Sequence, residues 1–174
     1  MPCLYLTKIN NWKGAGNMAI RSAAKAIIVH EERVLLNRCT GHQGEIYYDL
    51  PGGGQRQFET LEEAVIRECL EETGRLVKII RFAALCEEIY DDQELREKYF
   101  DYTHRVHHIF LAELASDVVL KPTETDFQQD ENQWINISDI PFIDLRPRLI
   151  RDHFFEIMES SFPLYLGSIH EGCY

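Results

Sequence analysis

Apolar and polar residues follow a strand-like pattern over the first third of the chain, and helical spacing then replaces it. Strand patterns cover 26–29, 33–38 and 46–50, with a turn at 30–32 and a stop at Pro51. Apolar residues then recur at Leu61, Ala64 and Val65, the spacing of a helix that packs along one face. Gly74 provides the end of this helix. The pattern therefore predicts strands followed by one central helix.

More strands and a second helix follow. Strand patterns cover 77–88, 105–114 and 133–137, a turn or short helix follows at 138–141, and a helical pattern covers 148–160. The acidic and aromatic segment 90–102 predicts a long solvated loop or the tip of a hairpin, with a rim over a substrate as the alternative. His107 and His108 point to opposite faces of their strand, so they do not chelate one ion as a pair. This order of elements predicts an α/β (α+β) fold, a sandwich around a mixed β-sheet.

Length and composition indicate one soluble domain. Residues 1–17 look like an N-terminal extension and 18–174 like a single domain, and the choice between Met1 and Met18 as natural start stays open. No apolar run approaches the ~20 residues that span a bilayer. The five cysteines are scattered without a CxxC pattern, which favours reduced thiols and a cytoplasmic location. The net charge of −11 argues against duplex nucleic acid and anionic membranes as partners.

The central helix carries more carboxylates than a helix needs. Thr60 and Glu63 have the spacing of a capping box. At about 100° per residue, Glu68, Glu71 and Glu72 share an arc that overlaps the apolar face. Three carboxylates there are costly unless a cation lies among them, and oxygen ligands suit Mg²⁺ or Mn²⁺. The spacing alone leaves open whether this face binds metal or is a solvated acidic surface.

The motif extends beyond the helix. Five residues separate Gly53 from Glu59, seven separate Glu59 from Arg67, and Arg67 continues as RECLEETGR. This resembles the Nudix box, G-x5-E-x7-R-E-U-x-E-E-x-G-U, where U is a bulky apolar residue. Cys69 and Arg75 stand at the two U positions and depart from the pattern. The box covers about an eighth of the chain, and the strand pattern extends the resemblance to about 20–145.

The resemblance implies a Nudix-type pyrophosphohydrolase with an α/β/α sandwich. Such an enzyme hydrolyses a nucleoside diphosphate linked to another moiety, such as a nucleotide sugar, ADP-ribose or a nucleoside triphosphate, with Mg²⁺ or Mn²⁺ as cofactor. The partner is then a small molecule, and a homodimer stays open. By motif position, the metal ligands are Glu68, Glu71 and Glu72, with Glu59 as a further ligand or support. Arg67 is expected to orient a box carboxylate, and Gly53 to let the backbone approach the helix.

Several residues outside these positions are candidates for binding and catalysis. Arg38 and Arg56 are candidates for phosphate contacts, and Tyr48 for lining a nucleotide pocket, although each residue type is more often structural. A water that attacks phosphorus often needs a further carboxylate. The loop before Trp134 offers four, at Glu124, Asp126, Asp130 and Glu131. We predict Glu131 as the general base, with Glu59 and Glu71 as alternatives inside the box.

Two other functions remain to be weighed. A Nudix-fold module that senses a nucleotide without hydrolysing it would be favoured by lost box carboxylates, and all are present here. An acidic interaction protein with a calcium-like site would need an Asp-rich loop, which the sequence lacks. The pyrophosphohydrolase is therefore the leading prediction, without a choice of nucleotide substrate.

Overall fold

The computed structural model describes residues 20–125 and 128–171; the predicted extension at 1–17 and Met18 lie outside them. The strands are β1 (Arg21–His30), β2 (Arg33–Thr40), β3 (Ile46–Asp49), β4 (Gly52–Gly54), β5 (Arg75–Tyr90), β6 (His104–Val119), β7 (Gln129–Asn136), β8 (Leu145–Arg146) and β9 (Leu164–Glu171). The helices are α1 (Leu61–Thr73), α2 (Gln93–Lys98), α3 (Arg148–Asp152) and α4 (Phe154–Glu159), with 3-10 helices η1 (Phe100–Tyr102) and η2 (Ile137–Phe142). Within the described ranges, no helix is long and apolar enough to cross a membrane.

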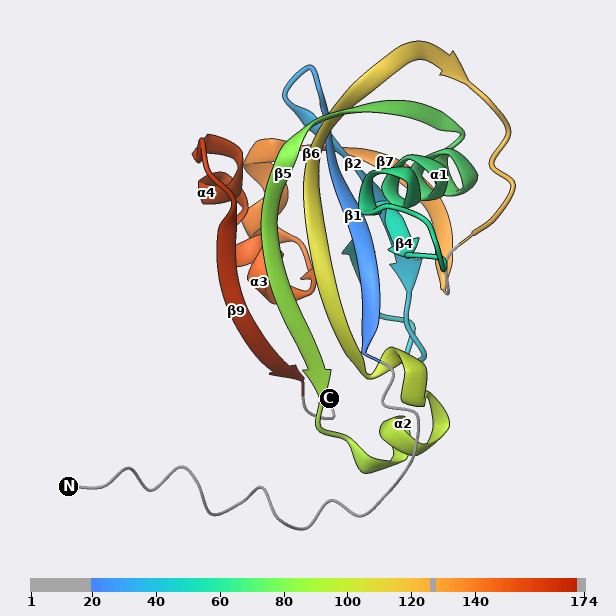
Figure 1. Cartoon of the computed structure of the whole chain (residues 1–174), viewed down its shortest axis with the longest axis vertical. Helices are drawn as coiled ribbons and strands as arrows, with labels where there is room; N and C mark the ends of the chain where they lie inside the picture. The colour runs from blue at the N-terminus through green and yellow to red at the C-terminus, as the bar shows by residue number, and fades with distance from the viewer. Residues whose placement is uncertain (1–19, 126–127, 172–174) are drawn as a thin grey trace, which may run out of the picture.

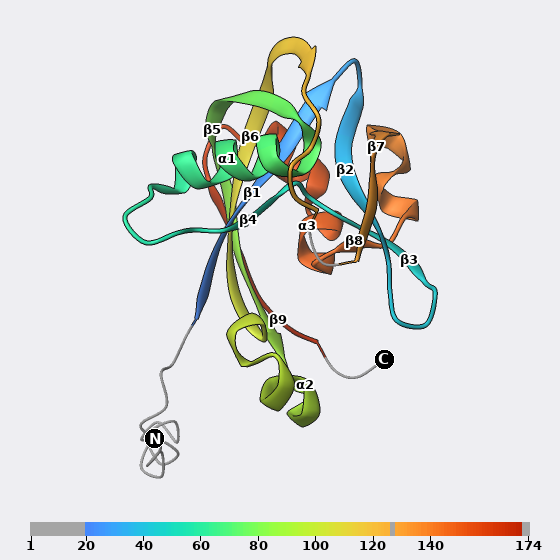
Figure 2. The same cartoon turned by 90° about the vertical axis from the view of Figure 1, so that its right-hand side faces the viewer.

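The strands form a mixed sheet with helices on both faces (Figure 1). The order is β8-β3-β2-β1-β6-β5-β9, and β4 and β7 pair in addition with β1 and β2. β1 runs antiparallel to β2 but parallel to β6. The view turned by 90° shows α1 on one side of the strands and α3 on the other (Figure 2). The predicted α/β/α sandwich around a mixed sheet is thus confirmed.

β1 is the middle strand of the sheet, and both of its faces are therefore buried. Ala24, Ala26 and Ile28 join the apolar cluster that packs under α1. Ile27, which points the other way, joins the cluster that includes Phe154 of α4. Side chains alternate between the faces of a strand, so a strand that is buried on both faces needs an unbroken apolar run. The sequence AAKAIIV provides that run, with Lys25 as its one charged member.

α1 begins and ends as its local sequence predicts. Thr60 caps the helix and exchanges hydrogen bonds with Glu63 in a capping box. Gly74 ends it with φ +66°, and a Cβ there would stand 1.9 Å from the carbonyl oxygen of Leu120. The chain after β6 therefore passes directly over the end of the helix. There the Thr123 and Glu124 amides both donate to the Glu71 carbonyl, at 2.8 and 3.1 Å, which fixes the 120–125 segment against α1.

Three segments differ from their predicted structure. The glycine triplet forms strand β4, which pairs with β1 and which the sequence pattern did not predict. The 90–102 segment lies at the tip of the hairpin of β5 and β6, as one of its predicted structures required, but it contains α2 and η1 instead of a long loop, and Asp92 caps α2. The predicted helix at 148–160 is two short helices that meet at His153. Residues 137–142 form the expected short helix, η2.

Candidate functional site

The site begins where the glycine strand β4 meets α1. β4 pairs with β1 through Ala24 and Gly53, which leaves its other side against the helix. A Cβ at Gly53 would stand 2.7 Å from the Glu68 carboxyl carbon. Any side chain there would displace Glu68, so the expectation that Gly53 permits close approach agrees with the geometry. The Gly52 amide also donates to the Glu72 carboxylate at 2.9 Å.

Arg67 binds three of the box glutamates at once. Its Nε and Nη2 donate to the two Glu59 carboxylate oxygens at 2.7 and 2.9 Å. Its Nη1 donates to Glu68 at 2.7 Å and to Glu71 at 2.9 Å. A further bond of 3.1 Å reaches the Gly54 carbonyl. A guanidinium presents five N–H donors in a planar fork, so one side chain satisfies all four partners.

This network shifts the pKa of both main partners. Hydrogen bonds from Arg67 lower the pKa of Glu59 to about 2, against the opposing effect of its burial. The same bonds, first those to Glu59, raise the pKa of Arg67 above its ordinary value. For Glu59, Glu68 and Glu71, the cation that the sequence pattern required is therefore Arg67 itself.

Glu72 is held separately and is only 4% exposed. Its Oε2 accepts from Asn37 Nδ2 at 2.9 Å as well as from the Gly52 amide. Asn132 of β7 in turn donates to Asn37 Oδ1 at 2.8 Å. Sequence reasoning missed both asparagines. The sequence does mark Asn37, because this polar residue directly follows the apolar residues 34–36 of β2.

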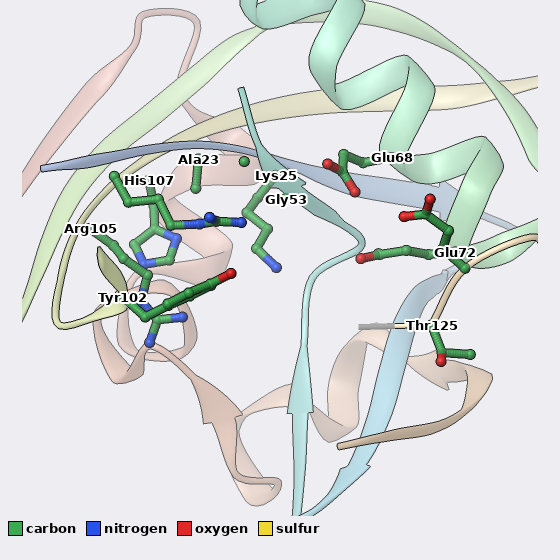
Figure 3. Close-up of a pocket in the computed structure, with 12 residues that line it drawn as sticks. Ala23, Lys25, Gly53, Glu68, Glu72, Tyr102, Arg105, His107 and Thr125 are labelled. Carbon is green, nitrogen blue, oxygen red and sulfur yellow. The ribbon is translucent and has the colours of Figure 1, made fainter. Parts of the chain in front are cut away.

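Glu68 and Glu72 line a cavity of about 180 Å³ next to β4. Figure 3 shows the two glutamates extending from α1 on one side, and Arg105 and His107 of β6 on the other. The full lining is Arg21, Ala23, Lys25, Gly53, Gly54, Glu68, Glu72, Tyr102, Arg105, His107, Glu124 and Thr125. The cavity therefore has an acidic wall from the helix and a basic wall from β1 and β6.

The other predicted residues lie outside this cavity lining. Arg56 is exposed and contacts Glu71 at 3.4 Å. Arg38 pairs with Asp130 at 2.7 Å across β2 and β7. Tyr48 donates to Gln133 at 3.3 Å and packs against the core on the α3 side. These contacts are structural, and phosphate or nucleotide binding by Arg38, Arg56 and Tyr48 stays a prediction.

The fold separates the described loop carboxylates from one another. Glu124 lines the cavity, and Asp126 lies outside the described residues. Glu131 follows the strand alternation of β7 away from Asn132, is exposed, and accepts a hydrogen bond from Gln133 at 2.7 Å. The predicted base Glu131 thus faces away from the glutamates that line the cavity, because neighbouring residues of a strand point to opposite faces.

The donor set fits a hard divalent cation. Across residues 20–125 and 128–171, no three Asp, Glu, His or Cys side chains are already arranged to hold one ion. Glu68 and Glu72 nevertheless face the same cavity with carboxylate oxygens, the ligands that Mg²⁺ and Mn²⁺ prefer. Glu59 and Glu71 are bound to Arg67, and neither lines the cavity. Of the predicted ligands, Glu68 and Glu72 are the two that line the cavity.

Known proteins resemble this chain in sequence and in fold. The family model described as the NUDIX domain matches residues 19–154. The MutT protein from Bacillus halodurans superposes with a TM-score of 0.67 at 21% identity, over 87% of this chain and 90% of that one. An ADP-ribose pyrophosphatase from Streptococcus suis gives a TM-score of 0.57 at 16% identity, over 84% and 99%. No curated protein sequence matches the chain.

The Arg67 network predicts a stability that depends on pH. We expect Arg67→Gln, in metal-free buffer at pH 7, to lower the melting temperature by about 10 °C. Breaking a largely buried ion pair costs about 3–5 kcal/mol, and each kcal/mol shifts the melting temperature by about 2–4 °C in a domain of this size. The pKa of Glu59 is about 2 in the folded chain and ordinarily 4.5. Its contribution is complete above pH 4.5 and is lost as the pH falls toward 2.

Thermal unfolding followed by circular dichroism between pH 7 and pH 3 measures this effect. The difference between wild type and Arg67→Gln should shrink below pH 4.5. Arg33→Gln, which removes an exposed ion pair with Glu31, serves as control and should change the melting temperature little at any pH. A difference for Arg67→Gln that stays constant down to pH 3 would contradict the role given to Glu59.

Proposed function

This chain belongs to the Nudix family of pyrophosphohydrolases, and we propose that it hydrolyses the diphosphate bond of a nucleoside diphosphate linked to another moiety, with Mg²⁺ or Mn²⁺ as cofactor. Nudix hydrolases generally use divalent metal ions. One observation carries the proposal: the box residues Glu68 and Glu72 face a cavity whose opposite wall carries Arg21 and Arg105. A substrate with a diphosphate and a second polar moiety matches both walls.

Some side chains of the site would bind the metal ions, and others hold those metal ligands in place. Glu68 and Glu72 would hold the divalent ions, which offset the charge of the diphosphate and lower the pKa of a bound water. Asn37 and the Gly52 amide hold the Glu72 carboxylate, so its direction is set before substrate arrives. Arg67 holds Glu68 in the same way. Of these residues, Asn37 and Arg67 act by positioning.

Glu124 replaces Glu131 as our candidate for the general base. Two hydrogen bonds from backbone amides to the Glu71 carbonyl fix the backbone at Thr123 and Glu124, and Glu124 is among the residues that line the cavity with Glu68 and Glu72. A base must lie within hydrogen-bond reach of the attacking water, directly or through one water. Glu124 lines the cavity in which the water would be held. Glu131 lies on the other face of β7, away from that cavity.

The expected partner is a small molecule. The net charge of −11 argues against duplex nucleic acid as a partner, because binding its backbone requires positive charge on the protein. Divalent ions between carboxylates and phosphate oxygens remove this obstacle for a diphosphate. The cytoplasmic location, the homodimer and the division into 1–17 and 18–174 stay predictions.

The metal requirement is tested by turnover of a panel of nucleoside diphosphate derivatives. We expect hydrolysis with Mg²⁺ or Mn²⁺ and none with EDTA. Glu72→Gln keeps the size of the side chain but removes a charged ligand, so we expect kcat to fall by at least about a hundredfold, or about 2.7 kcal/mol of barrier. Phosphate release after a coupled phosphatase measures the rate.

Glu62→Gln is the matched control, because Glu62 is an exposed carboxylate in the first turn of the same helix. It should keep the wild-type rate. Full activity of Glu72→Gln on a verified substrate would contradict the proposed site. Nucleotide binding without turnover of any derivative would instead support the sensing module.

The choice of base is tested by two substitutions of the same type. Glu124→Gln should lower kcat at least about tenfold, or about 1.4 kcal/mol of barrier, because it removes the group that takes the proton. Glu131→Gln should leave kcat unchanged, because this carboxylate faces away from the cavity and contacts Gln133. Rates measured across pH 6–9 with saturating Mg²⁺ give the comparison. The opposite result, a loss in Glu131→Gln alone, would return the role to Glu131.

A further inference from the structure

The basic wall of the cavity contains a buried histidine with an unused ring nitrogen. His107 lies on β6, is 1% exposed and lines the cavity at the end away from α1 (Figure 3). Within the described residues, its Nδ1 is buried and has no hydrogen-bond partner. Buried polar atoms are nearly always hydrogen-bonded, so an unpaired nitrogen in a residue that lines the cavity points to a group that binds there.

Glu88 fixes which ring nitrogen is available. His107 Nε2 lies 3.1 Å from Glu88 Oε2, and Arg105 Nη2 lies 2.7 Å from the same oxygen. Burial alone would raise the pKa of Glu88, but the hydrogen bond with His107 and the charge of Arg105 lower it to about 2. Glu88 is therefore ionised at neutral pH and accepts hydrogen bonds only, so the proton between the two residues lies on Nε2.

The imidazole is neutral in this setting. Burial lowers the pKa of His107, against the opposing effect of its bond to Glu88. The Glu88 charge is already balanced by Arg105, which favours a neutral ring. A neutral imidazole with its proton on Nε2 has a bare Nδ1 that acts as an acceptor. The group that binds His107 must therefore be a hydrogen-bond donor.

The small volume and the polar lining of the cavity favour a sugar over a nucleobase as the group that binds His107. At about 180 Å³, the cavity is smaller than the 300–1,000 Å³ typical of whole-ligand sites, so it holds only part of a substrate. Tyr102 offers an aromatic ring, but the Arg21 guanidinium already lies over it at 4.5 Å from the ring centre. Polar side chains line the rest of this end. A hydroxylated ring next to a phosphate matches such a wall.

We propose that His107 Nδ1 accepts a hydrogen bond from a hydroxyl of the distal sugar, the one joined to the nucleoside through the diphosphate. The enzyme thereby selects nucleoside diphosphate sugars over nucleoside triphosphates. This inference rests on the proposed pyrophosphohydrolase activity. A triphosphate has no sugar hydroxyl beyond its phosphates and leaves Nδ1 without its donor. A site built to hydrogen-bond a hydroxyl discriminates against a substrate that lacks it.

A substrate-by-variant comparison tests the assignment. The variant is His107→Phe, which keeps a ring and removes the acceptor. The substrates are ADP-ribose, its analogues that each lack one hydroxyl of the distal ribose, and ATP, all with Mg²⁺. We expect the wild type to prefer ADP-ribose. In His107→Phe, kcat/KM for ADP-ribose should fall at least about tenfold, and kcat/KM for ATP by less than about twofold.

The deoxy analogues separate a direct contact from a structural effect. With the wild type, kcat/KM for one analogue should be about tenfold lower than kcat/KM for ADP-ribose. With His107→Phe, the two values should be equal. His108→Phe is the matched control, because His108 points to the other face of β6, where it contacts the Ala23 carbonyl at 3.2 Å. It should leave the preference for ADP-ribose unchanged.

An independent readout covers the case in which His107→Phe does not fold. In the wild-type protein, ¹⁵N NMR of the histidine rings should show one buried Nδ1 signal that shifts when ribose 5-phosphate is added. An unshifted signal at saturating ribose 5-phosphate, or equal losses of kcat/KM on ADP-ribose and ATP, would overturn the assignment of His107. Absence of turnover on every diphosphate would instead contradict the proposed function.

Discussion

The Arg67 guanidinium is the interaction on which the site depends. It binds Glu59 in the loop before α1, Glu68 and Glu71 on the helix, and the Gly54 carbonyl in β4. Three separate pieces of the chain are thereby held to one side chain. Without this cation, three carboxylates at the end of a glycine strand would repel one another. The fixed direction of Glu68 into the cavity follows from this network.

The opposite wall of the cavity depends on a different constraint, the parallel pairing of β1 and β6. This pairing places Arg21 beside Arg105 and Ala23 beside His107, residues that lie more than eighty positions apart in sequence. Parallel strands require a long crossover, and here the crossover contains β4, α1 and β5. The same connection therefore brings the acidic helix to one side of the cavity and the basic strands to the other.

The sequence predicted the parts of the site that are local. The Thr60 cap and the Gly74 stop followed from spacing along one helix, and the resemblance to the Nudix box implied that Arg67 pairs with a box carboxylate. Asn37 was visible as a polar residue next to apolar ones, but its contacts and those of His107 depend on strand pairings with distant segments, which periodicity does not identify. α2 was missed because it buries no residue and so has no apolar period, and β4 because glycine has poor strand propensity. The fold class, by contrast, followed from the order of elements alone.

The most direct test of this account is a crystal structure of the protein with Mn²⁺, with the ion located by its anomalous scattering. We expect an ion in the cavity with carboxylate oxygens of both Glu68 and Glu72 among its ligands, and with Glu59 still bound to Arg67. An ion bound by Glu59 and Glu71 outside the cavity, or no ion on α1 at saturating Mn²⁺, would contradict it.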